Sequence, residues 1–169
     1  MVKFSNWILV VLALALVMIA TPAIGGENQN MRPIWGSFEG EATFPFNDAC
    51  TTVTGVPFQT LSNTKGHILH LGKTLFSTAH CATPDGMAAV GGLATLTAAN
   101  GDEVWLTYTA TTLTPPPLVM QRMDSFIVGG TGRFEGATGL LTGMVYVTFE
   151  GLDDPSWPIE FVLAGYIVY

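Results

Sequence analysis

The stretch GGTGRFEGATG, residues 129–139, decides the fold. It lies between two segments with the character of β-strands, Ser125–Val128 and Leu140–Phe149. A dinucleotide-binding loop needs G-x-G-x-x-G before a helix, but here the third glycine comes one residue late, at Gly136, and a strand follows. A P-loop needs Gly-Lys-Ser/Thr after its glycines, and that motif is absent. The stretch is therefore not interpreted as a cofactor loop.

A structural role explains the same stretch better. Glycine adopts positive φ without steric cost, as a tight connection between strands requires, and the large Phe134 is placed to plug the end of a barrel. We interpret the segment as a barrel-closing crossover. Its structural residues are Gly130, Gly132, Phe134, Gly136 and Gly139.

The rest of the chain predicts an all-β protein, a single antiparallel β-barrel of about eight strands. From Ile34 to Phe44, apolar or small residues alternate with polar ones, which predicts a half-buried strand with a small inner face. Asn100-Gly101 predicts a hairpin turn. Pro45–Gly55 is expected to be a loop, and Thr114–Pro117 a connection or an edge. Further strands are expected at His67–Thr78 (bent at Gly72), Gly92–Ala98, Glu103–Thr111, Met120–Val128, Leu140–Phe149 and Pro158–Tyr169.

The N-terminus has the pattern of a secretory signal peptide, assigned to residues 1–23. Lys3 precedes an apolar run of 14 residues, Trp7–Ala20, and Thr21-Pro22-Ala23 offers small residues for cleavage. The run is shorter than the roughly 20 residues that span a bilayer. An uncleaved membrane anchor is the alternative. Residues 24–33 are then an N-terminal extension and residues 34–169 the barrel domain.

Charge and cysteine content point to a protein outside the cytoplasm. Without Lys3, five Lys and Arg stand against 13 Asp and Glu, a net charge of −8. Such a surface repels nucleic acid, whose binding depends on basic side chains. We expect a secreted or periplasmic protein without stable membrane insertion after cleavage. Cys50 and Cys81 are expected to form a disulfide; a reactive or metal-bound thiol is the alternative.

The last strand predicts self-association. One face of Pro158–Tyr169 carries Ile159, Phe161 and Leu163, yet the other face is also apolar, with only Glu160 polar. A strand that is apolar on both faces is covered on both faces. In a single-layer barrel, the outer cover must come from another element or another subunit. We therefore expect a homo-oligomer, a dimer or a trimer.

The glycine-rich stretch also resembles a known family. Gly130-Thr131-Gly132-Arg133-Phe134 followed by Gly136-Ala137-Thr138-Gly139 is similar to the G-G-T-G-x-F-x-x-A-x-G segment of the allene oxide cyclase-like and dirigent-like barrels. The Asn100-Gly101-Asp102 hairpin and the Leu71-Gly72-Lys73 bend resemble those of small exported bacterial members. The resemblance spans Trp35–Tyr169. It implies an eight-stranded antiparallel barrel of calycin-like shape, often trimeric in the plant members. The plant enzymes' catalytic residues have no matching positions here.

Histidines and carboxylates give several candidates for chemistry, each with a plain structural alternative. His67 and His70 are expected on opposite faces of one strand, which is unsuitable for joint metal binding. His80 is expected to be a surface or capping residue, although a metal site with His70 and a carboxylate is conceivable. Glu39 and Glu41 share one face about 6.5–7 Å apart, and the outward, solvated face is favoured for them.

The function expected is binding of a small hydrophobic ligand inside the barrel. The residues proposed to contact it are His70, Tyr108, Arg122 and Asp124. A cyclase/isomerase-type or dirigent-type enzyme is the alternative, and a structural barrel with a filled interior is the second alternative, since eight strands leave a lumen just wide enough for side chains to fill. No catalytic residue, metal or cofactor is assigned.

Overall fold

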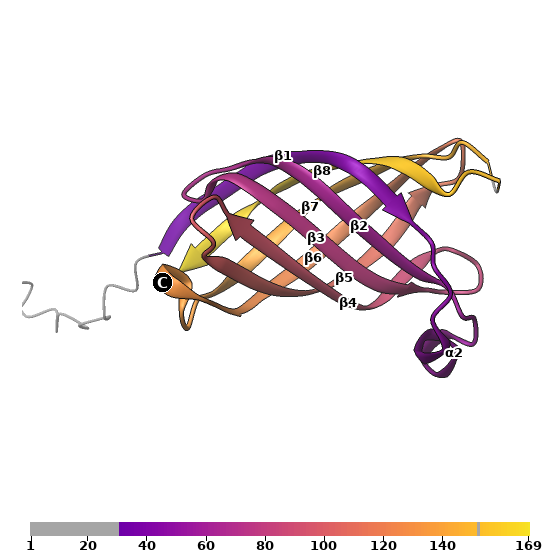
Figure 1. Ribbon diagram of the computed structural model, residues 1–169, viewed down its shortest axis with the longest axis horizontal. Helices are drawn as coiled ribbons and strands as arrows, with labels where there is room; N and C mark the ends of the chain where they lie inside the picture. Colours follow the sequence, from indigo (N-terminus) through magenta and orange to yellow (C-terminus); the bar gives the residue numbers. More distant parts are fainter. Residues whose placement is uncertain (1–30, 152) are drawn as a thin grey trace, which may run out of the picture.

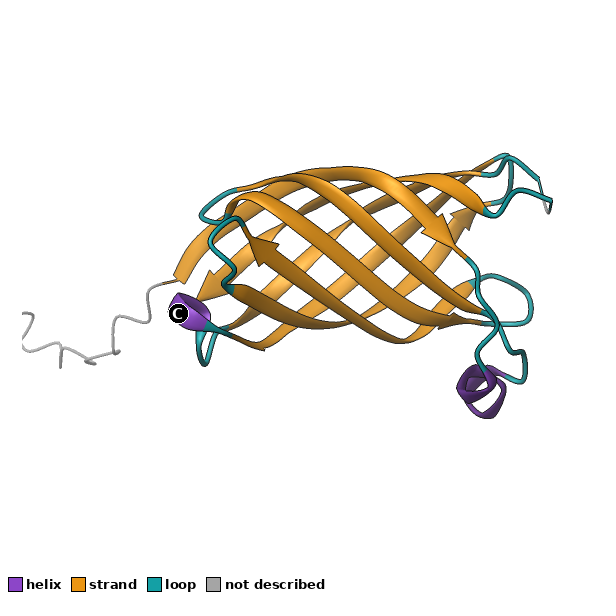
Figure 2. Cartoon of the chain, viewed as in Figure 1, coloured by secondary structure: helices purple, strands orange, loops and turns teal. Residues whose placement is uncertain are grey.

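The protein is a closed barrel of eight antiparallel strands (Figures 1 and 2). The computed structural model describes residues 31–151 and 153–169, so the predicted signal peptide lies outside the described residues. Each strand pairs with its neighbours in the sequence, and β8 pairs with β1 to close the sheet. The predicted fold class is confirmed, and the eight-stranded topology is the one that the family resemblance implied.

The strands are long and their connections short. The elements in chain order are β1 (Met31–Thr43), α2 (Asp48–Thr54), β2 (Gln59–Ile68), β3 (Gly72–Ala82), β4 (Ala88–Ala98), β5 (Glu103–Thr114), β6 (Leu118–Gly130), the 3₁₀ turn η1 (Gly132–Phe134), β7 (Thr138–Thr148) and β8 (Ser156–Val168). We name the two ends of the barrel by the elements found there. The η1 end is on the left of Figure 1, and the α2 end is on the right.

Three sequence expectations are wrong. His67–Thr78 is not one bent strand but the hairpin of β2 and β3, which turns at residues 69–71. The loop expected at Pro45–Gly55 contains the short helix α2, which begins with Asn47 accepting a hydrogen bond from the Ala49 amide and ends at Gly55 in the left-handed conformation. The strand β2 was not expected before His67 at all.

The other expectations on strands are confirmed. The inner face of β1 is the small one, as predicted, and Gly36 and Gly40 allow the facing backbone of β2 to approach closely. Residues 99–102, which contain Asn100-Gly101, join β4 to β5, with Gly101 at a φ of 89°. The triproline lies in the connection between β5 and β6. β1 begins at Met31, within the predicted extension.

Aromatic rings fill the middle of the barrel. The ring of Phe76 lies 5.1 Å from that of Phe38 and 5.0 Å from that of Phe161, measured between centroids. Phe38 faces Gly66 on β2, and its ring occupies the space that a side chain there would need. All three rings are buried. They separate an η1 half from an α2 half of the interior.

The predicted disulfide is present and attaches α2 to the wall. Cys50 of α2 and Cys81 of β3 are bonded, with their Cα atoms 5.3 Å apart. A disulfide is consistent with an extracytoplasmic location. Among the described residues, no helix is long and apolar enough to cross a membrane.

The glycine-rich segment is a connection between neighbours, not a crossover. β6 and β7 pair directly, and η1 folds over the barrel end between them. Gly132, with a φ of 57°, also lies so close to Asp102 that a side chain would collide with that carboxylate. Phe134 is fully buried and packs edge to face on Tyr169, with centroids 4.9 Å apart. Its placement at the barrel end agrees with the expected plug.

Phe134→Ala is expected to lower the free energy of unfolding by about 3–5 kcal/mol, because it leaves a cavity in the closed end. Urea unfolding followed by tryptophan fluorescence measures the change. Phe46→Ala is the control, since Phe46 is 77% exposed; a loss below about 1 kcal/mol is expected there. Equal stability of Phe134→Ala and the wild type would contradict the plug.

Candidate functional site

The four residues proposed from the sequence do not form one cluster. Arg122 and Asp124 lie on the outer wall, where they form an exposed ion pair of 3.1 Å, and Asp124 also accepts a hydrogen bond from Thr142. His70 lies in the β2–β3 turn at the η1 end. Tyr108 lies inside the barrel and is 6% exposed. Of the four, only Tyr108 faces the interior.

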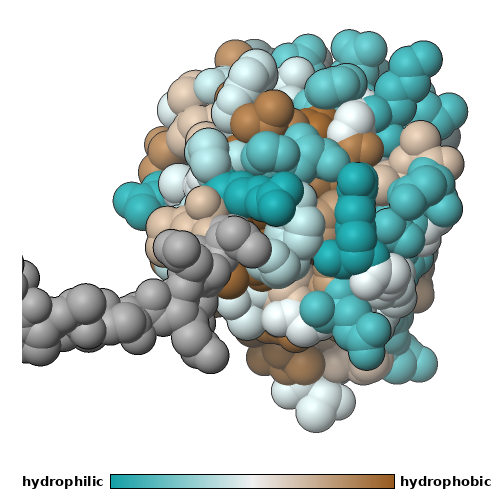
Figure 3. All heavy atoms as spheres, turned by 90° about the vertical axis from the view of Figure 1, so that its left-hand side faces the viewer, coloured by the Kyte–Doolittle hydropathy of each residue, from teal (hydrophilic) through white to brown (hydrophobic). Residues whose placement is uncertain are grey.

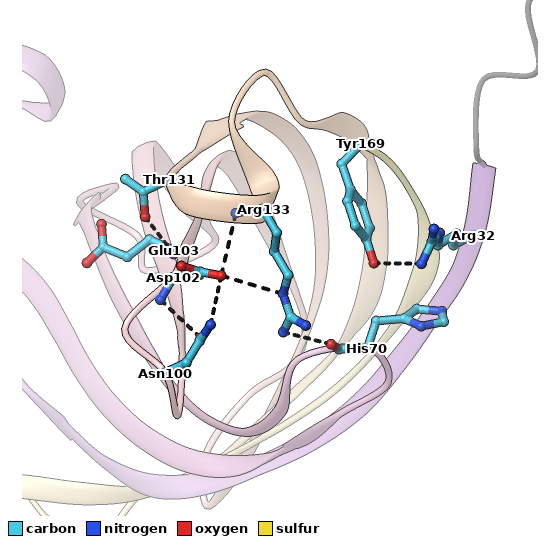
Figure 4. Close-up of polar contacts among 8 residues, drawn as sticks. All are labelled: Arg32, His70, Asn100, Asp102, Glu103, Thr131, Arg133 and Tyr169. Atoms are coloured by element: carbon cyan, nitrogen blue, oxygen red, sulfur yellow. Dashed lines mark hydrogen bonds and ion pairs between the residues drawn. The ribbon is translucent and has the colours of Figure 1, made fainter.

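His70 belongs to a polar network that joins the turns of the η1 end (Figure 4). Its Nε2–H donates to the Pro33 carbonyl at 2.9 Å, and its own carbonyl accepts from Arg133 at 2.9 Å. Arg133 also pairs with Asp102 in the β4–β5 connection, at 3.6 Å. Since these contacts link two turns to η1, the geometry gives His70 a structural position.

Two arginines and two aromatic rings cover the same end. The guanidinium of Arg32 lies 4.7 Å from the ring centroid of Tyr169, and that of Arg133 lies 4.7 Å from the ring of Phe134. Figure 3 looks onto this end, where hydrophilic residues spread over the surface among smaller apolar patches. Together with the buried Phe134, these groups close the η1 end to a ligand.

The interior of the α2 half contains a histidine–tyrosine pair. His80 of β3 and Tyr108 of β5 meet inside the barrel, with His80 Nδ1 2.8 Å from the Tyr108 hydroxyl. The two rings are nearly perpendicular, at 81°. The ring of Tyr108 lies over Gly92 of β4, where any side chain would overlap it. Among the described residues, His80 Nε2 has no hydrogen-bond partner.

Two hydroxyl groups extend this pair into a row. The Thr78 hydroxyl lies close enough to that of Tyr108 to lower the pKa of the phenol. Ser62 of β2 lies next, with its hydroxyl 2.7 Å from that of Thr78. Ser62 and Thr78 are directly paired across β2 and β3 and are almost fully buried. We call Ser62, Thr78, Tyr108 and His80 the polar row.

Burial keeps both ends of the His80–Tyr108 contact neutral. It lowers the pKa of His80 from 6.5 to about 4, because the charged imidazolium would lose its hydration. Burial also raises the pKa of Tyr108, an effect that the nearby Thr78 hydroxyl partly offsets. At neutral pH the site therefore consists of an uncharged imidazole and an uncharged phenol.

A further polar group faces the same interior. Ser125 of β6 pairs with Tyr108 in the sheet, and its buried hydroxyl has no hydrogen-bond partner among the described residues. Nearer the α2 end, Gln121 donates to the Thr112 hydroxyl at 3.1 Å. A buried hydroxyl without a partner loses the hydration it had in water. Ser125 is thus a second position where a ligand atom or a water could bind.

Aromatic residues pack together at the α2 end of the barrel. Trp157 lies between Phe44 and Phe149, with centroid distances of 4.2 and 4.7 Å, and its indole N–H donates to the Gly151 carbonyl. Phe44 and Trp157 are partly buried against the core. Shallow depressions also occur beside Leu93 and beside Trp105; the lining of the first includes Ser62 and Thr78, and the lining of the second includes no residue of the polar row.

The remaining sequence candidates take surface or separate positions. Glu39 and Glu41 are exposed on the outer face of β1, as favoured, and Glu41 accepts a hydrogen bond from Ser156. His70 and His80 lie near opposite ends of β3, a separation of about 30 Å along the strand, so they cannot share a metal ion. No cluster of three or more metal-binding side chains occurs within residues 31–151 and 153–169.

Sequence reasoning placed His80 at the surface, and the structure corrects this. The alternation of Thr74, Phe76 and Thr78 continues to His80, so this period-2 pattern was a signal for an inward ring. The partner Tyr108 is 28 residues away. No spacing rule could have joined them before the order of the strands was known.

Comparisons with known proteins give a distant structural similarity and no match by sequence. No protein-family model and no curated protein matches the chain. The chain is similar to a solved structure, that of the pterocarpan synthase dirigent protein GePTS1, with a TM-score of 0.46 and 11% identity over 82% of this chain and 85% of that one. The closed barrel of eight antiparallel strands fits the dirigent-like barrels, as the glycine-rich stretch implied.

The low pKa of His80 predicts a pH-dependent stability. The unfolded chain binds a proton near pH 6.5, whereas the folded protein does so only near pH 4. The free energy of unfolding therefore does not change through His80 above pH 6.5, and it decreases as the pH falls from 6.5 to about 4, by about 3 kcal/mol in total. His80→Gln should lack this loss in chemical unfolding measured from pH 7 to pH 4.

His67→Gln is the matched control, because His67 is exposed on the outer wall, and it should follow the wild-type profile. Carboxylates that titrate in the same range affect all three proteins and cancel in the differences. Parallel profiles for His80→Gln and the wild type would contradict the burial of a neutral His80.

Proposed function

We propose that the barrel binds a small, mainly apolar molecule in its α2 half, beside His80. The observation that carries the proposal is the presence of two polar positions without a hydrogen-bond partner in the interior. These are the Nε2 of His80 and the hydroxyl of Ser125, neither of which has a partner among the described residues. Ligand sites are typically apolar with a few well-placed polar groups.

The cost of these groups supports a functional interpretation. Polar groups in a core lower stability unless all their hydrogen bonds are made. The η1 half is filled mainly by apolar side chains that are at most 4% exposed: Ile34, Ile68, Leu96, Val104, Ile127 and Ile167. The buried Thr74 hydroxyl there has a partner, the Gly72 carbonyl. A purely structural barrel has no need of a histidine and an unpaired serine in its other half.

Small side chains occur in the α2 half. Its buried residues include Ala42, Ala89 and Ala110, beside the larger Val145, Val147 and Ile159. Small side chains limit the contacts that the walls make with one another. A ligand entering past Trp157 would pack against them and reach His80 with its polar group.

An enzyme of the cyclase or isomerase type is the second candidate. A specific observation favours it: a neutral imidazole 2.8 Å from a phenol is a pair that could move a proton on a bound substrate. The binding proposal comes first because it needs only recognition by these groups. A substrate screen that gives turnover abolished by His80→Gln would favour the enzyme.

The binding proposal is tested with native mass spectrometry of protein purified from its source and with the neutral fluorophore N-phenyl-1-naphthylamine. We expect a co-purifying small molecule, or saturable fluorescence enhancement with one site per barrel. Ala110→Leu should fill the space and remove binding with little loss of stability. If Ala110→Leu instead destabilises by about 1–3 kcal/mol and neither assay detects binding, the interior is filled and the proposal fails.

We also propose that the protein self-associates through the outer wall of β6, β7, β8 and β1. Phe126, Leu140 and Tyr166 form a row directly paired from strand to strand. Trp35 and Val162, at 63% and 51% exposed, add to this apolar face. Contiguous exposed apolar surface of this kind is typical of interaction sites, and a second copy of the chain offers the same surface.

Sedimentation velocity at increasing protein concentration tests this association. The wild type should sediment as a dimer or trimer, and Val162→Glu should shift it to the monomer, because a charge would be buried in the interface. Leu93→Glu is the control, since Leu93 is 61% exposed on β4, across the barrel from β8. A wild type that remains monomeric at high concentration would refute the proposal.

A further inference from the structure

The hydrogen bond between His80 and Tyr108 has a direction, and the direction determines what kind of atom His80 can bind. The contact joins Nδ1 of His80 to the phenol oxygen at 2.8 Å, so one group donates and the other accepts. A neutral imidazole carries one proton, so two arrangements are possible.

In the first arrangement, Tyr108 donates to Nδ1 of His80, and the imidazole proton is on Nε2. In the second arrangement, Nδ1–H of His80 donates to Tyr108, and the phenol proton must find another acceptor. Tyr108 is 6% exposed.

Burial decides between the two. The hydrogen bond to His80 is the only one that the Tyr108 hydroxyl makes within the described residues, so the second arrangement strands a buried donor, which costs its full hydration. His80 is only partly buried, so a donor on Nε2 can meet solvent or a ligand. The first arrangement therefore holds, and Tyr108 fixes the tautomer of His80 with the proton on Nε2.

We infer that the site selects small molecules with an uncharged oxygen acceptor, such as the carbonyl of a ketone or ester, which accepts a hydrogen bond from Nε2–H of His80. The inference rests on the proposed function and names the ligand class of the same site. A ligand that offers only donors has no partner at this nitrogen. A hydrocarbon fills the apolar space but leaves the N–H unpaired.

A carboxylate ligand is disfavoured by charge. All five basic residues of the described chain, Arg32, Lys65, Lys73, Arg122 and Arg133, are exposed, and none is inside the barrel to pair with an anion. His80 itself is neutral. Placing an unpaired carboxylate in the interior would cost several kcal/mol of hydration, which one neutral hydrogen bond does not offset.

Three naphthalenes of nearly equal shape separate these chemistries. They are 2-acetylnaphthalene, a ketone; 2-isopropenylnaphthalene, in which the carbonyl oxygen is replaced by a methylene; and 2-naphthoate, a carboxylate. Dissociation constants are measured at pH 7 by titration calorimetry with the protein purified from its source. We expect the ketone to bind about fivefold or more tightly than the hydrocarbon, and the carboxylate to bind most weakly.

Two variants connect the preference to the row. His80→Phe should bind the ketone and the hydrocarbon equally, because it keeps a ring but has no N–H. His67→Phe, the matched change on the outer wall, should keep the wild-type preference. Nitrogen NMR of the histidine rings tests the direction without any ligand: Nε2 of His80 should carry the proton in the wild type, and Tyr108→Phe should remove this tautomer preference.

The outcomes distinguish the two proposals. If none of the three probes binds, the proposed function and this inference fall together. If the probes bind but the ketone has no advantage, or the carboxylate binds best, the inference fails and the proposed function stands. A proton on Nδ1 of His80 in the wild type would also overturn the inference, because Nε2 would then carry no proton to donate.

Discussion

The pairing of β1 with β8 is the constraint on which the rest of the structure depends. The two strands match over their full length, from Met31 opposite Val168 to Thr43 opposite Ser156. This closure leaves the sheet without an edge, so every backbone group in the wall has a partner strand. It also gives every strand one face toward a lumen, and side-chain alternation then determines what that lumen contains.

The two halves of the lumen differ in their side chains: the η1 half is mainly apolar, and the α2 half contains most of the polar groups. In the η1 half, branched apolar side chains and Phe134 fill the space, and the arginines of the rim pack over the aromatic rings beneath them. In the α2 half, β2, β3, β5 and β6 contribute polar groups to the interior. The stable half holds the barrel in the register that brings Ser62, Thr78, Tyr108 and His80 together. The two halves therefore differ in composition, and the packed rings of Phe38, Phe76 and Phe161 lie between them.

The sequence predicted the apolar parts of this barrel and missed the polar ones for one reason. The alternation in β1, the Asn-Gly turn and the buried Phe134 each leave a strong local signal, and all three were predictable. The strand β2 was missed because its inward residues include Ser62, Thr64 and Gly66, so its inner face has no hydrophobic period. His80 was missed because its meaning depends on Tyr108, which is distant in the chain. The residues that sequence patterns failed to place are thus those that give the interior its chemistry.

Gly92 shows how far this dependence extends. It has no side chain, and both the carbonyl and the phenol ring of Tyr108 occupy the space where a side chain would be. Any larger residue at this position would meet the backbone of β5 as well as the ring, so the wall itself would have to shift. The contact between Tyr108 and His80 is thus made possible by a missing side chain on the strand between them.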